Sequence, residues 1–142
     1  MKYKFSMEKV LEWRQGKEKS AMEKFAVVQD HVQQQKSILA LIMSEFESTK
    51  EKCRKRNNIQ EMRQQHYYKE AIEEKIEKQT DLIHQTTENL ECMRLELVEA
   101  QKDRKIIEKL KEKDFSLYES NIKVVEQKEL DEMATLKFKK LF

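Results

Sequence analysis

Proline is absent from this sequence of 142 residues, and Gly16 is its one glycine. These two residue types most often break helices and form turns. Their near absence leaves room for little except long helices. It also excludes a glycine-rich phosphate-binding loop, which needs several glycines for its close backbone approach.

Long apolar runs are also missing. No stretch of about 18 consecutive apolar residues occurs, so the sequence predicts no membrane-spanning helix. The first residues include Lys2 and Lys4 and lack the apolar core of a secretion signal. The two cysteines, Cys53 and Cys92, lie far apart and are expected to be small core or surface residues of a cytosolic protein.

A dominant charge is missing as well. The 29 basic and 27 acidic residues are interspersed and leave a net charge of +2, which is typical of solvated helix faces and requires no nucleic-acid partner. Intrinsic disorder is the alternative for a chain that is 39% charged, above all at its ends. One basic cluster is either a solvated turn or a site for an acidic protein or lipid headgroups. It consists of Lys50, Lys52, Arg54, Lys55 and Arg56.

Apolar residues recur at alternating steps of four and three through residues 21–53. This first seam consists of Ala21, Phe25, Val28, Val32, Gln35, Leu39, Ile42, Phe46, Thr49 and Cys53. Eight of these ten residues are apolar. A 3.5-residue repeat of this length predicts a helix that buries a narrow stripe against another helix.

A second seam has the same spacing. It consists of Ile72, Ile76, Gln79, Ile83, Thr86, Leu90, Met93, Leu97, Ala100, Arg104 and Ile107. Two such helices joined by a short turn pack antiparallel. The sequence therefore predicts an all-α fold, an antiparallel two-helix coiled-coil hairpin with a projecting C-terminal helix end. We expect one domain over residues 1–142, with helices at about 5–54 and 62–138 and an apex at about 55–61.

The apex is predicted where apolarity falls, because Asn57 and Asn58 accept the left-handed conformations that a turn needs without glycine. One unbroken helix, pairing with a second copy, is the alternative. Neither seam shows a unique buried polar pair, so the register is predicted only to within about a heptad. Arg14 and Glu18 extend the first seam backwards but are poor core residues. Residues 1–20 are therefore expected to be helical but less tightly paired.

The end of the second helix is predicted to project. In this register Phe5 lies opposite about residue 109, which leaves everything after about Lys111 unpaired. Some 30 residues at 1.5 Å each make a helix of roughly 45 Å. It carries an apolar stripe that, after a stutter, includes Phe115, Tyr118, Ile122, Val125, Met133 and Leu136. An unpaired helix with such a stripe predicts a partner.

Residues for catalysis are not apparent. No Ser-His-Asp or Cys-His arrangement is supported, and a two-helix rod offers no concave pocket that excludes water. His31 and His84 fall opposite each other in a hairpin centred near residue 57, but no carboxylate or cysteine completes a metal-ligand set. We therefore expect no enzyme activity, no metal and no cofactor.

Three segments resemble the FliJ family of the bacterial flagellar type III export apparatus. They are the opening YKFSMEKVLEWRQGKEKSA (residues 3–21), the pair Tyr67 and Tyr68 at the start of the second seam, and EQKELDEMA (residues 126–134). The resemblance covers the whole chain in length and layout. It implies a coiled coil similar to the stalk of the rotary ATPase gamma subunit, in a cytoplasmic protein peripherally associated with the membrane at the flagellar base.

The resemblance also implies partners. These are an export ATPase ring (FliI-like) with its regulator (FliH-like), an export gate protein (FlhA-like) and export chaperones. Contacts with the ring are expected on the projecting end, at Phe115, Tyr118, Ile122, Val125, Glu126, Leu130 and Met133. The gate contact corresponds to Tyr68, Ile72, Ile76 and Gln79, although Ile72 and Ile76 are also seam residues and are equally expected inside the hairpin.

Three functional hypotheses follow. The first is a stalk-like coupler, which promotes assembly and activity of the ATPase ring and links the ring to the export gate. The second is an escort adaptor, which holds export chaperones without affecting ATP turnover. The third is a purely structural coiled coil. We expect a monomeric hairpin, with no nucleic acid and no direct membrane insertion.

Overall fold

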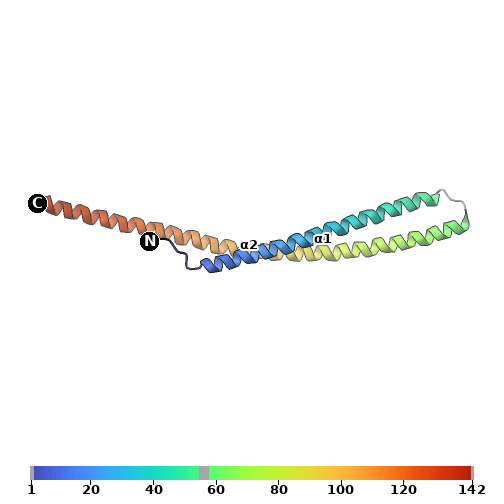
Figure 1. Ribbon diagram of the computed structural model, residues 1–142, viewed down its shortest axis with the longest axis horizontal. Coiled ribbons are helices and arrows are strands. Elements are labelled where there is room, and N and C mark those ends of the chain that lie inside the picture. Colours follow the sequence, from blue (N-terminus) through green and yellow to red (C-terminus); the bar gives the residue numbers. More distant parts are fainter. Residues whose placement is uncertain (1, 55–57, 142) are drawn as a thin grey trace. The chain divides into compact units, whose positions relative to one another are not determined.

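The computed structural model describes residues 2–54 and 58–141, and these ranges contain two long helices. Helix α1 spans Glu8–Arg54, and helix α2 spans Ile59–Leu141. The two helices pack against each other as a hairpin (Figure 1), which confirms the predicted all-α class. The unbroken helix is wrong, because α1 ends at Arg54 and α2 begins at Ile59.

Burial follows the two predicted seams closely. Every residue of both seams is buried or half-buried, and most residues between the seam positions are exposed. The most deeply buried side chains are Ile72, at 1% exposure, and Val32, at 4%. Each such side chain contributes about 1.5–3 kcal/mol by leaving water.

Polar side chains within the seams form specific hydrogen bonds. The amide Nε2 of Gln79 donates to the backbone carbonyl of Gln35 at 3.0 Å and to its Oε1 at 2.6 Å. The buried hydroxyls of Thr49 and Thr86 donate to carbonyls one turn earlier on their own helices. The sequence showed no unique buried polar pair, but the half-buried Gln35 and Gln79 meet across the seam, and a shifted register would separate them.

The predicted apex lies partly outside the described residues, which exclude 55–57 and so Asn57. Asn58 caps α2: its Oδ1 accepts the N–H of Gln60 at 3.2 Å, and its carbonyl accepts the N–H of Met62 at 2.9 Å. In the described ranges no residue has a positive φ. Asn58 therefore serves as a helix cap and not as the left-handed turn residue that we expected.

Contacts within the chain fall into two units. Unit 1 consists of Met1–Lys19 and Glu99–Phe142, and unit 2 consists of Ser20–Val98. Both helices run through both units. Unit 2 contains the polar pair Gln35 and Gln79 and most of the apolar seam.

Unit 1 is closed largely by ion pairs. Arg14 Nη1 lies 2.7 Å from Asp103 Oδ2, and Arg104 pairs with both Glu18 and Glu108. These hydrogen bonds, first that to Glu108, raise the pKa of Arg104. Arg14 and Glu18 are poor core residues, and they are half-buried here because each of them meets an opposite charge on α2.

Candidate partner-binding surfaces

The N-terminal segment of unit 1 lies against α2. Tyr3 precedes α1, and its hydroxyl donates to Asp114 Oδ2 at 2.8 Å. Its ring packs edge-on against Phe115, with centroids 5.1 Å apart, and lies 5.2 Å from Tyr118. Glu8 in the first turn of α1 adds an ion pair of 2.9 Å to Lys111. Tyr3 and Glu8 thus fasten the start of the chain to α2.

This environment changes the acidity of Tyr3. Partial burial, the hydrogen bond to Asp114 and the negative charges of Asp114 and Glu8 together raise the pKa of Tyr3 to about 12. Each of these influences disfavours the tyrosinate form. The contact of Tyr3 with Asp114 is therefore stable when the Tyr3 hydroxyl is protonated.

The end of α2 beyond Tyr118 is exposed at every described residue, 119–141. We call these residues the C-terminal segment (orange to red in Figure 1). Four apolar residues predicted for the ATPase ring lie on it: Ile122 at 38% exposure, Val125 at 54%, Leu130 at 61% and Met133 at 63%. Glu126 is exposed there as well.

The predicted ring-binding set is therefore divided. Phe115 and Tyr118 lie beside Tyr3, whereas the other five residues lie on the C-terminal segment. The projecting end of α2 begins after Tyr118 instead of Lys111, because the residues before α1 pack against α2 as far as Tyr118. The register already implied this, since Phe5 opposite residue 109 brings Tyr3 close to Lys111.

The predicted gate-binding residues lie along the side of α2 that packs on α1 in unit 2. Ile72 is fully buried, and Gln79 is hydrogen-bonded to Gln35. The hydroxyl of Tyr68 donates to the Glu45 carboxylate, a contact that raises the pKa of Tyr68, while its ring remains about half exposed. Ile72 and Ile76 were expected either in the gate contact or inside the hairpin, and Ile72 lies inside the hairpin.

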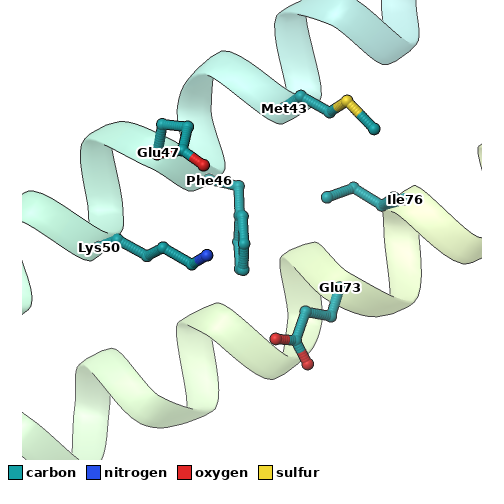
Figure 2. A pocket seen from close by; sticks show the side chains of 6 residues that line it. All are labelled: Met43, Phe46, Glu47, Lys50, Glu73 and Ile76. Carbon is teal, nitrogen blue, oxygen red and sulfur yellow. The ribbon is translucent and has the colours of Figure 1, made fainter.

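Ile76 is half-buried at the edge of a shallow groove in unit 2. Figure 2 shows the groove between α1 and α2, with Met43 and Phe46 on one side and Ile76 on the other. The ammonium of Lys50 lies 4.5 Å from the centre of the Phe46 ring, which is a cation–π distance. Glu73 lines the same groove from α2. Of the residues predicted for the gate, Tyr68 and Ile76 are thus the ones with an accessible edge.

The histidines and cysteines do not come together. His84 pairs with Glu88 on its own helix at 3.1 Å, and His31 is exposed. Cys53 and Cys92 are free thiols. In the part of the chain that the structure describes, no group of three or more candidate ligands could hold a metal ion.

The family model described as Flagellar FliJ protein matches residues 3–140. The chain belongs to the FliJ family. No curated protein and no solved structure matches the chain.

Membership of the FliJ family makes the protein a component of the flagellar export apparatus, and the family is a non-catalytic structural part of that apparatus. Its partners therefore belong to the same apparatus. Neither of the described helices holds an apolar stretch long enough to cross a membrane.

Proposed function

We propose that this protein is a stalk-like coupler, which binds the export ATPase ring, promotes its assembly and activity, and links the ring to the export gate. The single observation that carries the proposal is the C-terminal segment of unit 1. There a helix that pairs with residues 3–19 continues with its apolar stripe exposed.

The spacing of the stripe supports a protein partner. After Tyr118, the seam of α2 continues with Ile122, Val125 and Met133 at steps of four, three and eight residues, on one side of the helix. A side that would be buried in a paired coiled coil is here open to solvent over a segment of about 35 Å. Exposed apolar stripes of this kind mark sites of helix recognition.

The composition of the segment fits a contact that forms and releases. Charged residues such as Lys128, Glu129 and Asp131 separate the apolar side chains. An interface with a narrow apolar stripe and a polar rim binds less permanently than a broad apolar one. A ring that turns over ATP around the helix requires such a contact.

For the export gate we propose the accessible edge of unit 2. Tyr68 supplies an aromatic ring that is 48% exposed, and the neighbouring Tyr67 is 68% exposed. Aromatic residues are enriched where proteins contact each other. Ile72 supports this edge from the hairpin interior and does not touch the gate itself.

The experiment is ATP turnover and ring formation by the cognate flagellar ATPase, at equal molarity of this protein. Wild type is expected to stimulate turnover and to increase the hexamer fraction. Leu130→Asp and Met133→Asp are expected to reduce the stimulation at least fivefold without unfolding the hairpin, because a charge replaces an exposed apolar contact. Leu41→Asp, at a residue of unit 2 that is 72% exposed, is the matched control and keeps the stimulation.

Full stimulation by both C-terminal variants contradicts the proposed role of this segment. Chaperone binding with no change of ATP turnover by the wild type would favour the escort adaptor instead.

A further inference from the structure

Unit 1 carries a second apolar row on α2, beside the seam. Ile106, Leu110 and Leu117 are spaced by four and seven residues and therefore share one side of the helix. Their exposed fractions are 58%, 43% and 63%. Flanking positions of a two-helix coiled coil are usually polar, because they face water. This row therefore indicates a surface that another element covers.

Helix α1 adds Val10 and Trp13 to the same side of unit 1. Trp13 is 54% exposed, and the guanidinium of Arg14 lies 5.1 Å from its ring centre. The same guanidinium binds Asp103, which is three residues before Ile106 on α2. The Arg14 guanidinium thus contacts both the Trp13 ring on α1 and Asp103 on α2, near Ile106. Apolar residues of both helices therefore lie next to each other on this side of unit 1.

Positive charge surrounds these apolar residues. Exposed lysines occur three or four residues from them along each helix, at Lys9, Lys17, Lys102, Lys109 and Lys113. The Lys17 ammonium lies 4.1 Å from the centre of the Trp13 ring. The acidic residues at the same spacing are Asp103 and Asp114, and these are engaged by Arg14 and Tyr3. At this spacing lysines therefore outnumber the acidic residues beside the apolar row.

We propose that this side of unit 1 docks an amphipathic helix of a partner protein, one whose apolar stripe is flanked by Asp and Glu. Two helices with apolar residues on a shared side offer the groove that a third helix fills in a three-helix bundle. Acidic flanks complement the lysines and fix the orientation of the incoming helix. The surface uses none of the residues assigned to the ATPase ring, so it adds a binding site to the proposed coupler.

Trp13 makes the test direct, because it is the one tryptophan of the chain. The probe is a synthetic tryptophan-free helical peptide with leucine at a and d positions and glutamate at e and g, titrated into the full chain at low salt. Emission of Trp13 is expected to shift to the blue and to saturate as the ring leaves water. A matched peptide with lysine in place of glutamate is expected to bind at least tenfold more weakly.

Variants locate the site. Ile106→Asp is expected to weaken binding of the glutamate peptide at least tenfold, and circular dichroism checks that the helices remain. Leu82→Asp, at an exposed residue of unit 2, is the control and retains binding. Leu130→Asp also retains binding, which separates this site from the ring-binding segment.

Four outcomes overturn the proposal. They are equal binding of both peptides, no shift of Trp13 emission, a shift caused by anionic phosphatidylglycerol vesicles but not by the peptide, and a shift that accompanies doubling of the mass in light scattering. The third result would assign the surface to a membrane, and the fourth to a second copy of this chain.

Discussion

The two contact units of this hairpin are held together by different forces. Unit 2 closes over apolar side chains such as Val32 and Ile72, with one hydrogen-bonded glutamine pair at Gln35 and Gln79. Unit 1 buries Leu11 and Ile107 but otherwise relies on ion pairs and on the aromatic contacts of Tyr3. Partly exposed ion pairs weaken as the ionic strength rises, whereas apolar burial is not weakened by the screening of charges.

This difference suggests a division of labour. Unit 2 has the composition of a permanent scaffold. In unit 1 the two helices are held together by contacts that are individually weak. Unit 1 also carries the C-terminal segment and the proposed docking surface around Ile106 and Trp13. Regions that change partners are drawn from the less stable parts of a protein. The comparison predicts that perturbations of unit 2 are costly and that perturbations of unit 1 are mild and condition-dependent.

The largest effect is expected from Ile72→Ala in unit 2. The side chain is fully buried, so its truncation removes apolar contacts and leaves a cavity that costs about 3 kcal/mol. Urea unfolding followed by circular dichroism measures the change. Ile122→Ala on the C-terminal segment is the control, with an expected change within about 0.5 kcal/mol. Equal effects of the two variants would remove the distinction between scaffold and exposed segment.

A smaller effect is expected from Arg104→Ala in unit 1. Arg104 pairs with Glu18 across the helices, and its side chain is 23% exposed, so we expect a loss of stability that solvent screening keeps well below the loss caused by Ile72→Ala. Arg94→Ala is the matched control, because Arg94 pairs with Glu91 on the surface of α2 and is 51% exposed. Urea unfolding at 0.1 M and 1 M NaCl compares the variants. A salt-independent loss for Arg104→Ala would show that packing and not charge holds unit 1 together.

The smallest effect is expected from the pH dependence of Tyr3. Since its pKa is raised from 10.0 to about 12, the contact contributes its full stability below about pH 10 and loses it as the pH rises through about 12. Ultraviolet absorbance of tyrosinate in wild type and Tyr3→Phe isolates this titration. Tyr3→Phe keeps the ring contacts and removes the titrating group. A Tyr3 titration at pH 10 would mean that the N-terminal segment does not lie against α2.

Much of the fold could be predicted from the sequence, because the apolar residues of a heptad repeat lie on one side of the helix and pack against a second helix. Positions from Phe25 to Thr49 and from Ile72 to Ile107 were assigned to the seams from spacing alone, and the structure buries or half-buries each of them. The ion pairs of Arg14 and Glu18 were not predicted, because residue type was considered without the partner on the other helix. Their charge complements Asp103 and Arg104, a signal that appears only once the register is known.

The surfaces were harder to predict for the same reason. The sequence has three aromatic residues near its start, Tyr3, Phe5 and Trp13, and the contact of Tyr3 with Phe115 depends on a register that periodicity fixes only within a heptad. The position of Ile72 fits both the spacing of the predicted gate contact and the spacing of the second seam. Spacing predicts which residues share one side of a helix. It does not predict whether that side packs inside the hairpin or remains accessible to another protein.

Hydrogen–deuterium exchange of the full chain, alone and bound to the hexameric export ATPase, tests the central claim most directly. The account predicts that ring binding slows exchange of backbone amides in residues 119–141 and leaves those of residues 20–98 unchanged. Slowed exchange confined to residues 20–98, or no change in residues 119–141 with the complex demonstrably formed, would contradict it.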